Sequence, residues 1–313
     1  METIYLSHPH QLTKENHQPT VMALGFFDGV HLGHQEVIKT AVHEAKNRGC
    51  ISAVMTFSPH PKEVLAAHKL IGPMKYITPI EQKQKYIERL DVDRLYIVTF
   101  DIAFSKLTPQ QFVDDYLLSL HVCHVVAGFD YTYGHLGKGT METLPFHSRG
   151  QFTQTTIGKL KHDDVKISST QIRKLLADGK VEEVDDYLGR FYQVEGTVIH
   201  GEKRGRTIGF PTANIEVQEK FLLPRLGVYA VSLQTEDKSY NGLCNLGYKP
   251  TFTKDNLIPS LEVHLFDFDG DLYDKQVTVT FYLYIRSEQK FLGIEQLVDQ
   301  ITKDKEVALR YFS

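Results

Sequence analysis

The first half of the chain alternates short apolar runs with longer segments of helical periodicity. Each apolar run has the length of a strand, and the segment after it repeats apolar residues every three or four positions. The predicted strands are 20–25, 51–57, 94–100 and 122–127, and the predicted helices are 33–48, 79–90 and 108–120. Apolar strands separated by helices are typical of a parallel sheet covered on both faces. We therefore expect a doubly wound, Rossmann-like α/β domain.

The pattern changes near residue 190. Apolar residues now alternate with polar ones in short runs, separated by turns rich in Gly, Pro and Asp. The clearest runs are 192–199, 228–233 and 277–285. This pattern indicates antiparallel strands of a barrel or sandwich, followed by a final helix over 293–311. Two short helices are expected over 166–188, so we place the domain boundary near 187, with domains 1–187 and 188–313.

Composition narrows the class of protein. Of the 313 residues, 42% are hydrophobic and 24% are charged, which is ordinary for a globular protein. No apolar run is long enough to span a membrane, and no secretory signal is visible. The net charge of −4 is spread over both halves, so a nucleic-acid partner is not expected. Three widely spaced cysteines argue against a disulfide framework or a zinc site, and we expect a reduced, cytoplasmic protein.

A turn rich in glycine and histidine follows the first predicted strand and opens the first helix. Ligands bind at such turns in doubly wound sheets, and the amides of a helix N-terminus attract phosphate. Six residues of this turn are candidates for binding phosphate: Gly25, Phe26, Asp28, His31, Gly33 and His34. Taken alone, two histidines three positions apart are also compatible with surface side chains beside a tight turn.

A second polar motif begins another short helix. It consists of Ser168, Ser169 and Thr170, with Arg173 one turn further on. Hydroxyl groups and an arginine there are suited to a triphosphate. Ordinary capping of the helix N-terminus is the alternative for the hydroxyl groups.

The second half contains a glycine-rich segment with basic and hydroxyl side chains. The candidates for binding phosphate here are Gly201, Lys203, Gly205, Gly209, Pro211, Thr212 and Asn214. Closely spaced glycines allow backbone amides to surround phosphates. The neutral oxygens of Thr212 and Asn214 suit a magnesium ion that substrate phosphates already hold. A series of glycine-rich β-turns is the alternative.

The motifs of the first half resemble the signature of the nucleotidyltransferase superfamily, a His-x-Gly-His turn and a Ser-Ser-Thr-x-x-Arg helix. The strings at 27–34, 56–61 and 126–134 narrow the resemblance to the FMN adenylyltransferase half of bacterial bifunctional FAD synthetase. The resemblance implies that His31 and His34 act on the phosphates of ATP. It further implies that FMN binds near His60, Pro61 and Asp130.

The second half resembles riboflavin kinase, above all in the string Gly-Phe-Pro-Thr-Ala-Asn at 209–214. The match continues through 245–251, 261–268 and 285–291. This resemblance implies a Greek-key β-barrel with a C-terminal helix. It also implies that Glu262 is the catalytic base and that Arg286 and Phe291 lie by the flavin. Without the resemblance, Glu262 is equally compatible with a surface charge on a strand.

Together these resemblances imply a bifunctional enzyme of FAD biosynthesis with ATP, riboflavin and FMN as substrates and Mg²⁺ accompanying ATP. They also imply that the candidate phosphate-binding residues of each half bind ATP. Some positions depart from the family pattern. Tyr131 and Tyr133 stand where phenylalanine is common, and 135–139 lacks the usual arginine. These departures leave one alternative open, a riboflavin kinase with a weakened adenylyltransferase half. A flavin-binding regulatory protein that keeps the barrel as its ligand pocket is a separate alternative.

Overall fold

The computed structural model describes residues 1–65, 74–201, 204–218, 220–248 and 259–313. Lys203, one of the expected ATP-binding residues, lies outside them. The chain forms two compact units, Met1–Ser169 and Thr170–Ser313, and each is described by itself.

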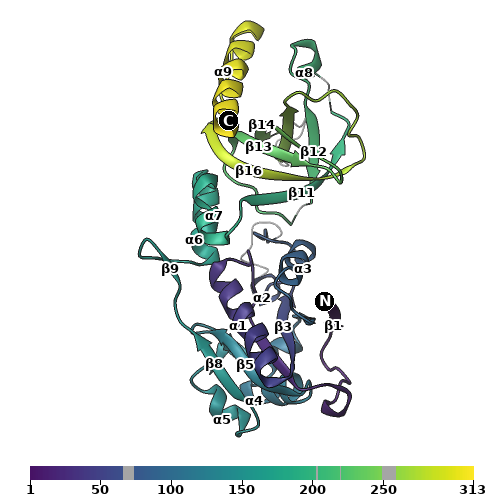
Figure 1. Ribbon diagram of the computed structural model, residues 1–313, viewed down its shortest axis with the longest axis vertical. Coiled ribbons are helices and arrows are strands. Elements are labelled where there is room, and N and C mark those ends of the chain that lie inside the picture. The colour runs from purple at the N-terminus through teal and green to yellow at the C-terminus, as the bar shows by residue number, and fades with distance from the viewer. Residues whose placement is uncertain (66–73, 202–203, 219, 249–258) are drawn as a thin grey trace. The chain divides into compact units, whose positions relative to one another are not determined.

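A six-stranded parallel sheet forms the centre of the first unit (Figure 1). Its strands lie in the order β1-β4-β3-β2-β5-β8. Their bounds are β1 (Glu2–Leu6), β2 (Thr20–Leu24), β3 (Ile51–Ser58), β4 (Arg94–Thr99), β5 (Val122–Gly128) and β8 (Thr153–Ile157). The chain steps from β2 through β3 to β4 and then returns to place β5 on the other side of β2. This reversal between β2 and β5 is the switch point at which such sheets bind ligands.

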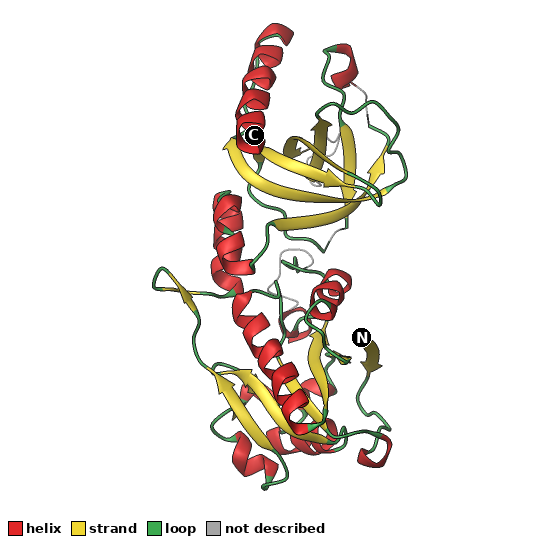
Figure 2. Ribbon diagram, in the orientation of Figure 1, coloured by secondary structure: helices red, strands yellow, loops and turns green. Residues whose placement is uncertain are grey.

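Helices cover both faces of this sheet (Figure 2). Alternate residues of each buried strand point to opposite faces, so each strand packs apolar side chains against both layers of helices. In β2, Val21 and Ala23 pack on the face covered by α1 (Leu32–Arg48) and α3 (Ile80–Glu88). Met22 and Leu24 pack on the other face, against α4 (Pro109–Phe112) and the π-helical turn Val113–Leu118. The predicted doubly wound α/β domain is thus confirmed.

The expected helix start at Thr108 is present as a capping box with Gln111. The shorter elements of this unit were not predicted. They are α2 (Pro61–Leu65), α5 (Leu144–Ser148), β6 (Thr132–Tyr133), β7 (Gly139–Thr140), β9 (Lys161–His162), β10 (Val165–Lys166) and the 3₁₀ turns Lys14–Asn16, Phe104–Lys106 and His135–Gly137.

The second unit contains a closed antiparallel barrel, as expected for its half of the chain. Its six strands follow the order β11-β12-β15-β14-β13-β16. They are β11 (Tyr192–Ile199), β12 (Ala213–Val217), β13 (Gly227–Gln234), β14 (Ser239–Tyr248), β15 (Pro259–Leu265) and β16 (Gln276–Arg286). A short helix, α8 (Arg204–Thr207), follows β11.

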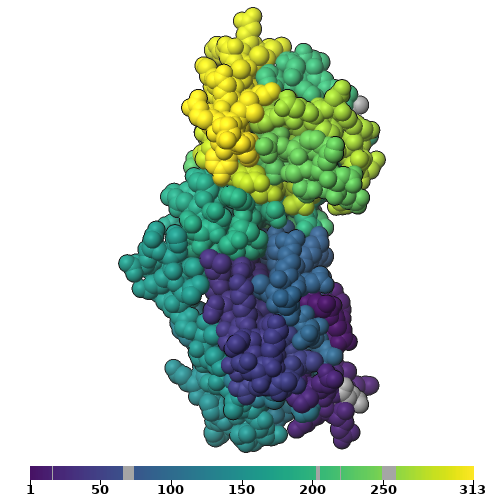
Figure 3. Space-filling model, viewed as in Figure 1, coloured from purple at the N-terminus to yellow at the C-terminus, as the bar shows by residue number. Residues whose placement is uncertain are grey.

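Three helical segments precede the barrel and one follows it. Those before it are α6 (Ser169–Asp178), the 3₁₀ turn Val181–Glu183 and α7 (Asp185–Leu188). The C-terminal helix α9 (Ile294–Phe312) packs through Ala308 on a cluster that includes Val228, Leu243 and Phe266. Figure 3 shows α9 in yellow as an exposed ridge along the barrel.

Candidate functional site

The turn after β2 has a strained backbone that buried hydrogen bonds hold in place. Phe27 and Val30 have φ of 56° and 41°, in the left-handed region that non-glycine residues rarely adopt. The buried Asp28 side chain accepts hydrogen bonds from the amides of Ile77 (3.0 Å) and Thr78 (3.2 Å). Strain of this kind persists only where surrounding contacts determine the conformation, and it clusters at functional sites.

His31 and His34 form a stacked pair at the start of α1. Their ring centroids are 3.4 Å apart with an interplanar angle of 14°. His31 caps the helix, since its Nδ1 accepts a hydrogen bond from the amide of His34 at 3.2 Å. Because Nδ1 is the acceptor, the proton of the neutral His31 ring is on Nε2. At Gly33, a Cβ atom would lie 3.2 Å from the His31 ring, so a side chain there would require that ring to shift by a few tenths of an ångström.

The ring of His34, the second histidine of this pair, is electrically neutral. Burial lowers the pKa of His34 well below its usual value, and the nearby His31, Lys83 and Lys166 lower it further. Among the described residues, none gives the buried Nδ1 of His34 a hydrogen-bond partner. A buried polar atom without a partner is costly, and it marks a position where a ligand group can bind.

An aromatic cluster adjoins the turn at the end of β3. The Phe26 ring lies 4.3 Å from the His60 ring, edge to face, and 6.1 Å from the ring of Tyr76. The His60 amide donates to the Tyr76 hydroxyl at 3.0 Å, and that hydroxyl donates to Glu63. Pro61 is the first residue of α2. The structure therefore brings Phe26 and His60, expected to bind different substrates, into direct contact.

Lys83 is a buried cation beneath this cluster. Its Nζ donates to the Phe26 carbonyl at 2.6 Å and to Thr56 Oγ1 at 3.3 Å, and it lies 4.1 Å from the centre of the Phe26 ring. Burial lowers the pKa of Lys83 to about 8, while nearby Asp28 opposes the shift. Lys83 was not predicted, although the period of α3 places it on the buried face with Tyr86 and Ile87.

The remaining residues expected in the adenylyltransferase half lie in two places, after β5 and at the start of α6. Asp130 follows β5, at the switch point, and forms an ion pair with Lys166. The Ser169 hydroxyl donates to the Asp28 carbonyl at 2.8 Å, which joins the second motif to the first. Thr170 and Arg173 belong to the second compact unit, whereas Ser168 and Ser169 belong to the first.

In the barrel, Glu262 stands in a row of polar residues across three strands. On β15, Glu262 is the register partner of Asn214 on β12 and of Asn245 on β14. Register partners share a face of the sheet, so the three side chains lie next to one another. The Ser260 hydroxyl donates to Glu262 Oε1 at 3.2 Å. Asn245 was not predicted, because strand register cannot be read from one strand alone.

The glycine-rich segment leads into this row. A Cβ atom at Gly201 would overlap the buried Asn214 side chain, so only glycine fits there. Gly205 lies in α8, and its carbonyl accepts a hydrogen bond from the Phe210 amide at 2.9 Å. Gly209 has φ of 85°, and Thr212 is exposed.

A cavity of about 510 Å³ lies beside this segment. Its lining is Gly209, Phe210, Pro211, His264, Leu265, Asp267, Phe268, Asp269, Thr302 and Lys305. The ring of Phe210 meets that of His264 edge to face at 5.2 Å, and His264 Nδ1 lies 2.9 Å from the Pro211 carbonyl. Two expected ATP-binding residues, Gly209 and Pro211, therefore border a space lined by aromatic rings, two aspartates and a lysine.

Comparison with known proteins assigns the chain to a family. The FAD synthetase family matches residues 13–171, and the riboflavin kinase family matches residues 188–312. A bifunctional riboflavin kinase/FMN adenylyltransferase of Bacillus subtilis (strain 168) is 51% identical over 314 residues, 100% of this chain and 99% of that protein. The chain belongs to the family of bifunctional riboflavin kinase/FMN adenylyltransferases.

Other similar proteins cover the same length. A bifunctional riboflavin kinase/FMN adenylyltransferase of Listeria monocytogenes is 47% identical over 313 residues, 100% of this chain and 99% of that protein. A crystal structure described as a macrolide-efflux protein from Streptococcus pneumoniae has a TM-score of 0.87 and 33% identity, over 98% of this chain and 99% of that one. No helix in the described part of this chain has the length and apolar character to cross a membrane.

In this member of the bifunctional family, Arg286 is held by the C-terminal helix. It ends β16, and its guanidinium pairs with the buried Asp304 of α9. The guanidinium also lies 5.8 Å from the centre of the Phe291 ring, so the two residues expected near the flavin are close to each other. Glu288, between them in sequence, lies against Gly247, two residues from Asn245.

Proposed function

We propose that this chain makes FAD in two ATP-dependent steps, one in each half. The barrel transfers the γ-phosphate of ATP to riboflavin, giving FMN and ADP. The α/β unit then joins FMN to the AMP part of ATP, giving FAD and pyrophosphate. The observation that carries the proposal is that each unit holds its own polar centre, the histidine pair in the first and the Glu262 row in the second.

In the kinase step, Glu262 accepts the proton of the ribityl 5′-hydroxyl as its oxygen attacks the γ-phosphorus. A general base there needs a carboxylate within hydrogen-bond reach of the attacking hydroxyl. The place of Glu262 between Asn214 and Asn245 supports this role, because its two register partners are neutral amides. Phosphoryl transfer otherwise depends on positioning and charge stabilisation.

We place ATP of the kinase step along the glycine-rich segment, with its base in the adjoining cavity. Gly201, Gly205, Gly209 and Pro211 would follow the phosphates, and the aromatic walls at Phe210 and His264 suit a purine ring. Arg286 and Phe291 would lie by the isoalloxazine of riboflavin. Their mutual contact and the ion pair with Asp304 support a rigid flavin site.

Mg²⁺ would enter this site with ATP. The amide oxygen of Asn214 lies beside Gly201, and Thr212, two residues earlier on the chain than Asn214, is exposed. Both side chains carry the hard oxygen ligands that Mg²⁺ prefers. Two neutral protein ligands suit an ion that phosphates and water hold on its other sides. When bound, Mg²⁺ would neutralise charge that develops on the phosphates.

In the adenylylation step, a phosphate oxygen of FMN attacks the α-phosphorus of ATP, and the bond to pyrophosphate breaks. The attacking phosphate is already anionic, so no protein base is required. His31 would donate from Nε2, and the neutral His34 would supply a further hydrogen bond to the same phosphates. Gly25, Asp28 and Gly33 shape the turn, while Ser168, Ser169, Thr170 and Arg173 would complete the triphosphate site.

FMN would bind between the carboxyl ends of β3 and β5. His60 and Pro61 follow β3, and Asp130 follows β5. The stacked and edge-to-face rings of Phe26, His60 and Tyr76 support a site for a flat aromatic ring.

The departure at Tyr133 does not favour a weakened adenylyltransferase. Tyr133 is buried in the core, and its hydroxyl forms a hydrogen bond with His147 Nδ1 at 2.8 Å. Its ring stacks on that of Tyr131, with the ring centres 6.3 Å apart. The extra hydroxyl of Tyr133 is thus satisfied within the fold.

The direct experiment is to incubate the chain with riboflavin and Mg-ATP and to separate the flavins by chromatography. FAD supports the two-step proposal, FMN alone supports a monofunctional kinase, and unchanged riboflavin supports a flavin-binding regulator. We expect this chemistry to take place in the cytoplasm.

A further inference from the structure

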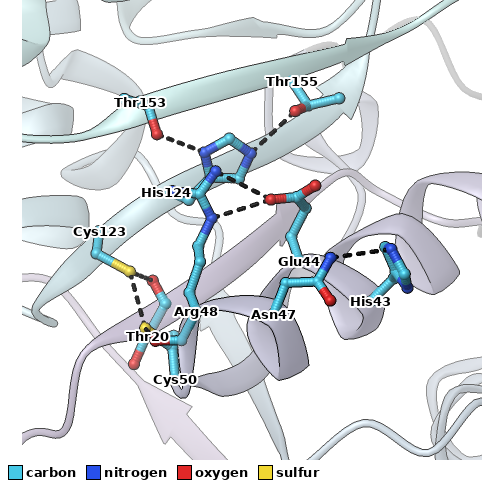
Figure 4. A network of polar contacts seen from close by, with 10 residues as sticks. All are labelled: Thr20, His43, Glu44, Asn47, Arg48, Cys50, Cys123, His124, Thr153 and Thr155. Carbon is cyan, nitrogen blue, oxygen red and sulfur yellow. Dashed lines mark hydrogen bonds and ion pairs between the residues drawn. The ribbon is translucent and has the colours of Figure 1, made fainter.

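Two thiols face each other across the amino end of β2. Cys50 directly precedes β3 and Cys123 lies in β5, the strands on either side of β2. Their Sγ atoms are 3.3 Å apart, and Cys123 Sγ also lies 3.4 Å from the Thr20 carbonyl (Figure 4). Both cysteines are half-buried and free, whereas Cys244 is buried in the barrel.

A bulge in β5 explains why Cys123 points toward Cys50. Thr20 pairs with Val122 and Val21 pairs with His124, so Cys123 is the extra residue between them. A bulge of this kind redirects a side chain. Cys123 and Cys50 consequently both pack against the apolar cluster under α1.

We propose that Cys50 and Cys123 form an oxidation site that closes into an intramolecular disulfide, with a low-molecular-weight disulfide such as oxidised glutathione as the oxidant. The site is separate from the proposed reactions. It lies at the amino ends of the strands, whereas the histidine pair and Asp130 follow their carboxyl ends.

The reaction proceeds in two thiol–disulfide exchanges. The thiolate of Cys50 attacks one sulfur of the oxidant, which forms a mixed disulfide and releases one small thiol. Cys123 then loses its proton and attacks Cys50 Sγ, so that the protein disulfide forms and the second small thiol leaves. Two protein thiols are oxidised, and one oxidant disulfide is reduced to two thiols.

The surroundings assign the two roles. Cys50 lies in the connection between α1 and β3, where its Sγ is 3.7 Å from the Arg48 carbonyl, and the Arg48 side chain is held aside by Glu44. Figure 4 shows these groups at the end of α1. Burial and the hydrogen bond with Cys50 raise the pKa of the Cys123 thiol to about 11, which makes it the slower nucleophile. Cys50 therefore reacts first, and Cys123 resolves the mixed disulfide.

The test uses the full chain, fully reduced and then incubated with oxidised glutathione. After acid quenching, denaturation and alkylation, the expected product is lighter by two hydrogen atoms and takes up one alkyl group, on Cys244, instead of three. Peptide mapping should recover a linked pair that contains Cys50 and Cys123. Each of three other outcomes would overturn the proposal. These are uptake of three alkyl groups, a lasting glutathione adduct on the wild-type chain, and a disulfide between two chains.

Single variants separate the roles of the two thiols. Cys123→Ser should retain glutathione on Cys50, because no second thiol can displace it. Cys50→Ser should stay reduced and take up two alkyl groups. Phenylarsine oxide, which bridges two neighbouring thiols without oxidising them, should bind once per wild-type chain and not to either variant. Failure of the reduced wild-type chain to bind it would show that the thiols are not neighbours in solution, and would overturn the proposal independently of any oxidant.

Discussion

Asp304 of the C-terminal helix holds the guanidinium of Arg286 at the end of β16. Arg286 Nε lies 3.0 Å from Oδ1 and 2.9 Å from Oδ2 of Asp304, and Nη2 lies 2.7 Å from Oδ2. Gln300, one turn earlier on the helix, donates to the same carboxylate at 2.9 Å. The pair fixes the point where the chain leaves the barrel toward Phe291, so a helix at the edge of the unit sets the geometry of the proposed flavin site.

Replacing Asp304 should therefore damage the kinase step. Asp304→Asn leaves the half-buried guanidinium of Arg286 without its buried counter-charge, and breaking a fully buried pair costs about 3–5 kcal/mol, which is the upper bound here. We expect a lower Tm and a raised KM for riboflavin, with a smaller change in the KM for ATP. Steady-state kinetics with each substrate varied gives the comparison. Asp299→Asn, an exposed site on the same helix, is the matched control and should leave both KM values unchanged.

Lys83 gives the adenylylation step an expected dependence on pH. Its pKa is lowered from 10.5 to about 8, so the positive charge near the Phe26 turn is lost as pH rises through 8. We expect the rate of FAD formation from FMN to fall above this pH. Between about pH 8 and 10.5, Lys83 is protonated in the unfolded chain and neutral in the folded chain. Its contribution to the free energy of unfolding therefore rises with pH over this range. A loss of stability caused by Lys83 would not explain the fall in the rate of FAD formation.

Lys83→Met tests this assignment. The methionine fills the buried space without charge, so the variant should fold. Its rate of FAD formation should be about 10-fold lower at pH 7, because hydrogen bonds from a charged group are lost, and the alkaline fall near 8 should disappear. Lys85→Met, exposed on the same helix, is the control. An unchanged alkaline limb in Lys83→Met would contradict the role given to this lysine.

The histidine pair should be required for one activity only. Changing His31 and His34 together to alanine removes the proposed phosphate donors, and loss of one such donor already costs about 10²–10³ in rate. FAD formation should be abolished, while riboflavin is still phosphorylated to FMN. His43→Ala, exposed further along α1, should change neither activity. Normal FAD synthesis by the double variant would remove the pair from the mechanism.

The sequence predicted those parts of the site that follow one another along the chain. The His31–His34 turn could be placed because a strand, a turn and a helix start lie within a few residues. Asn245 and Asp304 could not, because their roles depend on the register of β14 with β15 and on the packing of α9 against β16. Lys83 was missed for a related reason, since the hydrogen-bond acceptor it meets in the core is a backbone carbonyl far away in sequence.

Some elements were missed because their local pattern is weak. The edge strand β8 consists of Thr-Gln-Thr-Thr-Ile and is only partly buried, so it carries little hydrophobic signal. The bulge at Cys123 leaves no mark in the sequence either, although it decides which face that side chain occupies.

The boundary near 187 is open to a direct test with fragments. Hydrogen bonds join the segment before it to the barrel, among them those from the Arg225 amide to the Leu176 carbonyl at 2.8 Å and from the Tyr284 amide to Glu182 at 3.4 Å. A fragment 188–313 should fold and still make FMN. A fragment 170–313 should have the higher Tm, because it keeps these contacts. If only the longer fragment is soluble and active, the boundary must move toward residue 170.

The most direct measurement is the turnover of Glu262→Gln with two different flavins. Glutamine keeps the size of the side chain and much of its hydrogen bonding, but it cannot accept the proton of the 5′-hydroxyl. Phosphorylation of riboflavin should fall by about 10²–10⁴-fold. Supplied FMN should still become FAD at a near-normal rate, because that step takes place in the other half and needs no base. Glu216→Gln, exposed on β12, should leave both steps unchanged. Normal phosphorylation of riboflavin by Glu262→Gln would contradict the assigned base, and equal loss with both flavins would contradict the independence of the two sites.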